Sequence, residues 1–336
     1  MDTIAITGAS GFIGGRAAQR LQERGYHVVA LGRGKAPKSL GEAEYRQVAF
    51  DQAASLSAAL ENVHGILHCA GKAGAWGAYA DYYDANVALS ERLADAALKS
   101  GVRRFVNLSS PSIYFDYCDQ LALREDFIPR RFSNPYAETK YFAERAVHAR
   151  QSDHFEVISL RPRGVIGAGD TNWLPRIISM REAARLIQTG DGTNLANFTS
   201  IENLLDAIEL AFKAPSAATG RVYNIHNGPD EKFWDVVEQG LHSVGLDAER
   251  RVLPRGLVMS IARANALAQR LCRVTKEPDL LPVKAGVSAY SMTMDLTAAK
   301  ERLGFVPRQT TQEALAQFGR WYPTFQASSP EKRAAR

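Results

Sequence analysis

The 336-residue sequence lacks any run of about 18 apolar residues, the length that a membrane-spanning helix requires. It opens with a strand-like pattern at residues 3–7 instead of a charged segment followed by an apolar one, so we expect no signal peptide. Cysteine is scarce: Cys69, Cys118 and Cys272 are an odd number, without the spacing of a metal site or a CxxC motif. We therefore expect no disulfide framework and no metal site. This cysteine usage predicts a reducing, cytoplasmic location.

Acidic residues are absent from residues 250–276, a segment with seven lysines and arginines. The whole chain has 41 basic and 36 acidic residues, a net charge of +5, so −2 remains once these seven charges are removed. The body of the protein therefore has no nucleic-acid-binding character. Apolar residues recur at helical spacing in the same segment, at Leu257, Ile261, Ala264, Ala268 and Leu271. The helix could lie on an anionic membrane surface, cover a pocket as a lid, or be a solvated helix. The structural interpretations are favoured, because a face rich in alanine buries little area.

Strand and helix patterns alternate along most of the chain. Strands are predicted at residues 3–7, 27–31, 46–50, 65–69, 105–108, 156–160 and 221–225, and helices at 13–23, 56–60, 84–99, 134–149, 176–186 and 201–214. Strands joined by helix-length connections indicate βαβ units. We predict an α/β fold, a Rossmann doubly wound parallel sheet with a smaller C-terminal substrate-binding lobe. The expected division is a dinucleotide-binding domain at 1–166, whose sheet resumes at about 196–228, a lobe at 167–195 and 229–325, and a flexible tail at 326–336.

A glycine-rich turn, TGASGFIG at residues 7–14, follows the first strand and opens the first helix. Gly8 permits a tight turn, Gly11 lets backbone amides approach a pyrophosphate, and Gly14 lets the helix pack closely on the strand. Glycine turns also end strands for structural reasons, but this position in a βαβ unit favours binding. Together with Phe12 and Ile13, the glycines predict a dinucleotide at the helix N-terminus, where free N–H groups favour an anion.

No acidic residue follows the second strand, where the chain reads ALGRGK at residues 30–35. A carboxylate at this point would bind the ribose 2′-hydroxyl of NAD(H), whereas Arg33 suits the 2′-phosphate of NADP(H), with Lys35 or Lys38 as a second charge. We expect NADP(H) to be preferred, with NAD(H) as the alternative. These cations could instead form only a solvated loop.

Residues after the third and fourth strands are further cofactor candidates. Asp51 is a candidate contact for the adenine, although Asp is also common in turns. Ala70 and Gly71 are small enough to let the backbone lie against the cofactor. His68 and Cys69, which precede them, are interpreted as a core histidine and a buried thiol.

Tyr136 and Lys140 are four residues apart on a predicted helix, so their side chains share one face. A free phenol has a pKa of about 10, and a neighbouring ammonium would favour its deprotonated form. The segment Ser109-Ser110-Pro111-Ser112, after the preceding strand, offers a partner hydroxyl. The glycine turn, the serines and the Tyr–Lys pair, in this order, predict an oxidoreductase site.

The four segments TGASGFIG, LSSPSIY (108–114), NPYAETK (134–140) and LRPRGVIGAGD (160–170) resemble the extended short-chain dehydrogenase/reductase family. The resemblance covers nearly the whole chain and includes DLTAAKERLGFVP at residues 295–307. It implies that Tyr136 is the catalytic acid/base, and that Lys140 holds the nicotinamide ribose and lowers the pKa of the tyrosine. It implies Ser110 as the catalytic hydroxyl, with Ser109 and Ser112 as rivals by proximity.

The same resemblance implies that Pro162 and Val165 contact the carboxamide of the nicotinamide. It also makes a homodimer plausible, formed through the helices at residues 84–99 and 134–149. Within the family, GKAGAWG (71–77), RPR (161–163) followed by Gly169-Asp170, and GDGTN (190–194) are similar to 3β-hydroxysteroid dehydrogenase-type proteins. The segments are most similar to bacterial 2-alkyl-3-oxoalkanoate reductases, which reduce a β-keto acid with NADPH.

The function that follows is hydride transfer between NADP(H) and a ketone or secondary alcohol on a hydrophobic small molecule, a 3-oxoacid or a 3β-hydroxysteroid. Lys72 could pair with a substrate carboxylate and Trp76 could form the wall of an apolar pocket, or Trp76 could simply pack its loop. Tyr114 is a third expected substrate contact. Two alternatives remain: an NAD-dependent nucleotide-sugar epimerase or dehydratase, and a redox-sensing binding protein on the same scaffold. An intact Ser110, Tyr136 and Lys140 disfavours the sensor, which needs none of them.

Overall fold

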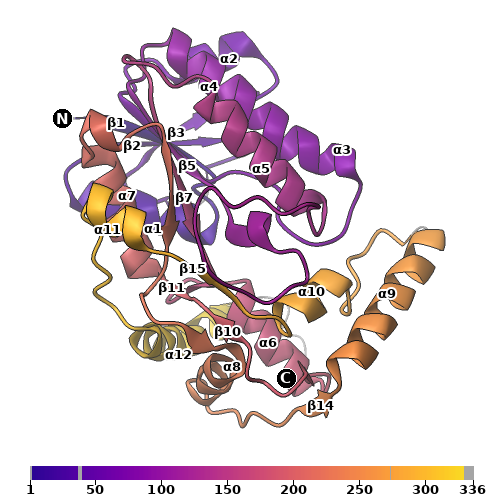
Figure 1. Ribbon diagram of the computed structural model, residues 1–336. Helices are drawn as coiled ribbons and strands as arrows, with labels where there is room; N and C mark the ends of the chain where they lie inside the picture. Colours follow the sequence, from indigo (N-terminus) through magenta and orange to yellow (C-terminus); the bar gives the residue numbers. More distant parts are fainter. Residues whose placement is uncertain (1, 37–39, 273, 329–336) are drawn as a thin grey trace.

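A parallel seven-stranded sheet organises the first two thirds of the chain. The computed structural model describes residues 2–36, 40–272 and 274–328 (Figure 1). The strands are β1 (Thr3–Thr7), β2 (His27–Gly32), β3 (Glu44–Gln47), β4 (Gly65–His68), β5 (Arg104–Leu108), β7 (Glu156–Pro162) and β12 (Arg221–Ile225). Their order is β12-β7-β5-β4-β1-β2-β3, and every neighbouring pair is parallel. This topology confirms the predicted doubly wound Rossmann fold.

Helices cover both faces of the sheet, which is why its central strands read as continuous apolar runs. On one face lie α1 (Phe12–Glu23), α7 (Ile201–Lys213) and α11 (Thr297–Leu303); on the other lie α2 (Ala53–Ala59), α4 (Leu89–Lys99) and α5 (Pro135–His148). Ion pairs also join α1 and the residue that caps it, Arg24, to α7: Arg16 pairs with Glu202 at 2.6 Å, Arg20 with Glu202, Asp206 and Glu209, and Arg24 with Glu209 at 3.0 Å.

The helix predicted at residues 84–99 begins earlier and changes its winding. It starts as α3 (Tyr79–Tyr82), continues as a π-helical segment over Tyr83–Ala88 and ends as α4. The π-helical segment carries the buried Asn86, whose Oδ1 accepts a hydrogen bond from the Lys72 amide at 2.7 Å and whose Nδ2 donates to Thr139 Oγ1 at 3.0 Å. Asn86 therefore connects the loop after β4 to α5; π-helical turns inside α-helices are frequent at functional sites.

The C-terminal lobe has its own core and small sheets. Its helices are α6 (Trp173–Glu182), α8 (Phe233–His242), α9 (Arg255–Leu271), α10 (Pro282–Val287) and α12 (Thr311–Ser328). A four-stranded sheet contains β13 (Glu231–Lys232), β10 (Leu195–Ala196), β15 (Met292–Met294) and β6 (Gln120–Leu123); the short pairs are β11 (Thr199–Ser200) with β8 (Val165–Ile166) and β14 (Arg251–Leu253) with β9 (Ile187–Thr189). The helix expected at 176–186 is α6, which ends at Glu182 because the chain then extends into β9.

The chain crosses the expected division of domains at two places. Strand β6, from the first 166 residues, pairs with β15 of the lobe, and α11, from the last third, packs against β12 and α7. Residues 326–328 of the expected tail continue α12, and residues 329–336 lie outside the described part of the chain. Within the described ranges, none of the helices combines the length and apolar character needed to cross a bilayer.

Candidate active site

The predicted site residues collect along one edge of the large sheet. Strands β1, β4, β5 and β7 are parallel, so their carboxyl ends lie at the same edge, and the chain reverses its order between β1 and β4. Open α/β sheets bind ligands at such a point. The segments that leave these four ends hold the glycine turn, the Ala70-Gly71 turn, the serine cluster and the Pro162–Val165 segment. The structure thus brings together parts that are far apart in the sequence.

The glycine turn is packed too closely to accept larger residues. A Cβ on Gly8, which has φ +72°, would lie 2.9 Å from the Ala70 amide nitrogen, and one on Gly14 would lie 2.3 Å from the Gly8 carbonyl oxygen. Helix α1 starts after Gly11 with no side-chain cap and no acidic residue in its first turn. Its first amides are therefore available to an anion, as a bound pyrophosphate requires. Phe12 and Ile13 are partly exposed at this helix start.

The turn after β2 presents Arg33 to solvent. The Gln47 Nε2 donates a hydrogen bond to the Arg33 carbonyl at 3.1 Å, and the Tyr45 hydroxyl donates one to the Gly34 carbonyl. These two side chains of β3 therefore fix the backbone of the turn. The Arg33 guanidinium is exposed and forms no ion pair among the described residues. Lys35 is also exposed, and Lys38 lies outside the described residues.

Asp51 lies farther from its strand than the sequence indicated. Strand β3 ends at Gln47 instead of Phe50, and Asp51 is exposed in the turn before α2.

The segments after β4 and β7 place four further candidates. Gly71 is exposed and Ala70 is partly buried, and a Cβ on Gly71 would lie 2.8 Å from Asn86 Oδ1. Pro162 is buried at the end of β7, and Val165 is partly exposed at the start of β8.

Helix α5 carries Tyr136 and Lys140 to the end of β5. Asn134 caps this helix by accepting a hydrogen bond from the Ala137 amide at 2.8 Å, and Pro135 occupies its first turn. Tyr136 follows in the first turn, and the Lys140 Nζ, one turn later, donates to the carbonyl of Leu108 at 2.6 Å. The cap therefore sets where the tyrosine sits, and the lysine joins α5 to the strand that leads into the serine cluster.

Among the three serines, the geometry favours Ser110. Its hydroxyl donates to Ser112 Oγ at 2.9 Å and accepts from the Ser112 amide at 3.2 Å, and it also hydrogen-bonds Tyr136. Ser109 instead is buried, with its hydroxyl unpaired among the described residues. Ser110 thus links the serine cluster to Tyr136.

Burial dominates the protonation of the site. It raises the pKa of Tyr136 above 10, and the hydrogen bond with Ser110 lowers that pKa only in part. Burial also lowers the pKa of Lys140 to about 8, against the opposing attraction of Glu144 one turn farther along α5. The ammonium of Lys140 donates its hydrogen bond to the Leu108 carbonyl, and burial outweighs the other effects on Tyr136, so the expectation that Lys140 lowers the pKa of Tyr136 stays a prediction.

His68 and Cys69 are poor candidates for chemistry. His68 is buried between the hydroxyls of Thr7 at 2.7 Å and Ser90 at 2.9 Å, and burial lowers its pKa to about 3. Burial raises the pKa of the Cys69 thiol to about 12, so it stays protonated at neutral pH. Both serve the structure of the sheet edge.

Tyr114 differs from the sequence-based expectation of a substrate contact. The side chain is fully buried, its hydroxyl donates to Asn224 Oδ1 at 2.7 Å and accepts from Arg161, and the Arg161 guanidinium carbon lies 4.8 Å from the ring centre. Arg161 in turn donates to Glu144 at 2.9 Å. Tyr114 is therefore a core residue whose hydroxyl accepts a hydrogen bond from Arg161 of a buried ion pair, and a pattern of residue types cannot distinguish such a tyrosine from one that lines a pocket.

Lys72 and Trp76 are engaged with the protein itself. The Lys72 ammonium lies 2.7 Å from an Asp81 carboxylate oxygen, so a substrate carboxylate would have to compete with Asp81. The Trp76 Nε1 donates to the Val274 carbonyl at 2.8 Å, and the Arg270 guanidinium lies 5.7 Å from its ring centre. Trp76 thus packs its loop against the C-terminal lobe.

One residue between the loop after β4 and the C-terminal lobe had no signal in the sequence. Glu277 accepts a hydrogen bond from the Ala75 amide at 3.0 Å and lies 3.3 Å from Arg176. It also pairs with Lys284. Glu277 therefore joins the loop after β4 to α6 and α10. Single acidic residues in loops carry no pattern, so only the tertiary structure reveals this role.

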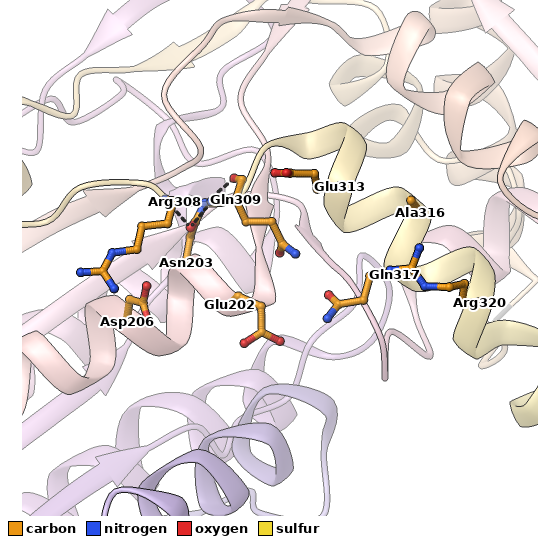
Figure 2. Close-up of a pocket in the computed structure, with 9 residues that line it drawn as sticks. All are labelled: Glu202, Asn203, Asp206, Arg308, Gln309, Glu313, Ala316, Gln317 and Arg320. Atoms are coloured by element: carbon orange, nitrogen blue, oxygen red, sulfur yellow. Dashed lines mark hydrogen bonds between the residues drawn. The ribbon is translucent and has the colours of Figure 1, made fainter.

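A separate hollow lies between α7 and α12 (Figure 2). It measures about 430 Å³ and mixes acidic, basic and amide side chains: Glu202, Asn203, Asp206, Arg308, Gln309, Glu313, Gln317 and Arg320, with Ala316. None of these is a predicted site residue. The chemistry-bearing residues thus lie elsewhere, at the sheet edge.

Comparisons with known proteins agree with this geometry. The family model described as "NAD dependent epimerase/dehydratase family" matches residues 4–225. The chain is 32% identical over 323 residues to 2-alkyl-3-oxoalkanoate reductase of Stenotrophomonas maltophilia, covering 93% of this chain and 97% of that protein. It is 29% identical to 3beta-hydroxysteroid-dehydrogenase/decarboxylase isoform 1 of Arabidopsis thaliana, over 69% of this chain and 56% of the relative. The solved structure of MoeE5 in complex with UDP-glucose and NAD superposes with a TM-score of 0.75 at 26% identity, covering 97% of this chain and 100% of that one.

Proposed function

Since the chain belongs to the NAD dependent epimerase/dehydratase family, we propose that it is an NADP(H)-dependent oxidoreductase that interconverts a ketone and a secondary alcohol on a hydrophobic substrate. The observation that carries the proposal is the grouping of Ser110, Tyr136 and Lys140 at the end of β5, at the same edge of the sheet as the glycine turn at the end of β1. The similarity to a 2-alkyl-3-oxoalkanoate reductase and to a 3β-hydroxysteroid dehydrogenase supports a keto or alcohol group as the reacting one.

The residues of the site divide the work between them. When bound, the nicotinamide would supply or accept the hydride. Tyr136 would give its phenolic proton to the substrate oxygen as the ketone becomes an alcohol, and take it back in the reverse direction. Ser110 would donate a hydrogen bond to the same oxygen and fix its position. Lys140 would hold the cofactor ribose and, as a cation in a buried site, favour the deprotonated form of Tyr136.

The turn after β1 fits a dinucleotide, because Gly8 and Gly14 let the turn and α1 pack closely against the protein backbone and the first amides of α1 are free for a pyrophosphate. The preference for NADP(H) rests on Arg33. Its exposed guanidinium has no ion-pair partner among the described residues, and no acid lies at the end of β2 to bind a 2′-hydroxyl. Arginine can hold a phosphate with two parallel hydrogen bonds.

We also propose a homodimer through α4 and α5. Leu98 of α4 and Phe142 of α5 are exposed, by 42% and 39%, and Phe142 belongs to a surface group of rings with Phe132 and Tyr141. An exposed aromatic group of this kind suits a protein interface. Light scattering during size-exclusion chromatography should give twice the chain mass, and a monomer at all concentrations would overturn the dimer.

The second candidate is a nucleotide-sugar epimerase or dehydratase, favoured by the match to a UDP-glucose and NAD complex. A substrate panel separates the two. The purified protein is incubated with NADPH or NADH and with 3-oxoacids, 3-ketosteroids or UDP-sugars. We expect net oxidation of NADPH with a 3-oxoacid or ketosteroid. Conversion of a UDP-sugar without net consumption of cofactor would establish the second candidate instead.

A further inference from the structure

Helix α9 turns a row of apolar side chains to solvent. Leu257, Ile261, Leu267 and Leu271 are 49%, 45%, 61% and 75% exposed, and Val252, just before the helix, is 59% exposed. In the described part of the chain twelve large apolar side chains are exposed, and five of them lie between residues 252 and 271. Such a concentration marks a surface that is covered in use.

The apolar row is the outer face of an anchored helix. Val258, Met259 and Ala262 are buried on the opposite side of α9 and pack with Ala285 of α10 and the ring of Tyr290. The residues recognised in the sequence at helical spacing, from Leu257 to Leu271, therefore face water and not the core. Figure 1 shows α9 at the periphery of the lobe, away from the large sheet. We call Leu257, Ile261, Ala264, Leu267, Ala268 and Leu271 the α9 stripe.

Basic residues adjoin the α9 stripe and no acid interrupts them. Arg263 and Arg270 are seven residues, about two turns, apart and so lie on the same side of the helix. Among the described residues neither these two nor Lys276 forms an ion pair, whereas Arg250 pairs with Glu238 at 3.2 Å and Arg255 with Asp119 at 3.3 Å. The stripe is thus apolar in the middle and cationic along its edge.

We propose that the α9 stripe binds the surface of a membrane that contains anionic lipids. In such binding, an amphipathic helix lies in the plane of the interface with its apolar face about 5–10 Å deep and its arginines at the phosphates. A second copy of this chain is the less suitable occupant, because two identical stripes would bring Arg263 and Arg270 against like charges. The proposal concerns an interaction surface and is independent of the reaction.

The stripe lies beside the loop that borders the proposed active site. In the last turn of α9 the Arg270 guanidinium lies against the ring of Trp76, and the Trp76 Nε1 donates a hydrogen bond to the carbonyl of Val274, just after the helix. A membrane bound at α9 would therefore lie next to the segment Lys72–Gly77 that follows β4. This location distinguishes the α9 stripe from the ring group on α5, which lies on the Rossmann domain.

Co-sedimentation of the full-length protein with vesicles tests the proposal. The vesicles contain phosphatidylcholine alone or phosphatidylcholine mixed with phosphatidylglycerol, at moderate salt. We expect binding to the anionic vesicles only. Ile261→Ser combined with Leu257→Ser should lower the partition coefficient at least tenfold, and Arg263→Gln or Arg270→Gln should each lower it about fivefold, as expected for one basic residue near an anionic surface.

Matched controls use exposed residues outside the segment. Leu121→Ser and Val306→Ser remove apolar side chains that are 58% and 66% exposed, and Arg302→Gln removes an exposed charge; all three should bind vesicles as the wild type does. Circular dichroism of each stripe variant confirms that it is folded. Failure of the wild type to bind anionic vesicles, or equal binding by the folded stripe variants, would overturn the proposal. Loss of a dimer in the stripe variants without any vesicle binding would assign the stripe to a second copy and overturn it too.

Discussion

Replacement of Lys140 by methionine should make the protein more stable at neutral pH while it removes activity. Burial lowers the pKa of Lys140 from 10.5 to about 8, and each pKa unit corresponds to about 1.4 kcal/mol. The buried charge therefore costs about 3 kcal/mol below pH 8. The hydrogen bond to Leu108 that methionine would lose is worth about 1 kcal/mol, so the variant should still gain stability at pH 7.

The sign of the pH dependence follows from linkage. Between about pH 8 and about pH 10.5 the unfolded chain keeps the proton on Lys140 while the folded protein releases it. Stability of the wild type therefore rises with pH through this window, relative to a variant that has no such proton. The free energy of unfolding of the wild type minus that of Lys140→Met should increase by about 3 kcal/mol from pH 7 to pH 10.5.

Urea unfolding of both proteins across this range measures the difference directly, and other titrating groups cancel between the two curves. Lys99→Met is the matched control, because Lys99 is exposed at the end of α4 and its ammonium stays in water in both states. The free energy of unfolding of Lys99→Met, plotted against pH, should run parallel to that of the wild type. A difference between wild type and Lys140→Met that stays constant with pH would refute the argument that burial governs this lysine.

Three further substitutions test separate parts of the account. Arg33→Asp should raise KM for NADPH about tenfold to a hundredfold and leave KM for NADH unchanged or lower; equal changes for both cofactors would exclude a phosphate contact. Gly14→Ala places a Cβ 2.3 Å from the Gly8 carbonyl oxygen and should weaken dinucleotide binding at least tenfold in a fluorescence titration, whereas Gly256→Ala, with nothing within 4 Å, should bind normally. Tyr114→Phe should lower the free energy of unfolding by about 1–3 kcal/mol in urea and leave KM for the ketone unchanged; a raised KM would restore Tyr114 as a substrate contact.

The doubly wound parallel sheet and the grouping of the candidate catalytic residues were predictable because their signals are local. The turn at Gly8–Gly14 needs only its own residues and the adjoining strand, and the spacing of Tyr136 and Lys140 places both on one helix face. Parallel strands then bring their carboxyl ends together without further information. A few neighbouring residues thus determine each of these features.

Features that depend on distant partners were not predictable. Gln120–Leu123 becomes a strand because Met292–Met294, far along the chain, pairs with it. Tyr114 is buried because Asn224 and Arg161 satisfy its hydroxyl. Periodicity identified α9 but not which face points outward, because the buried face of Val258, Met259 and Ala262 is equally apolar. In each case the deciding contact lies outside any sequence window.

The most direct test of the central proposal, hydride transfer with Tyr136 as the acid/base, compares Tyr136→Phe with the wild type. The measurement is steady-state oxidation of NADPH with the best substrate of the panel, together with the Kd of NADPH by fluorescence titration. We expect kcat to fall by a factor of about 10² to 10⁴, the usual contribution of a positioned proton donor, while Kd changes little because the phenyl ring keeps its place in α5. Wild-type turnover by the folded variant would contradict the account.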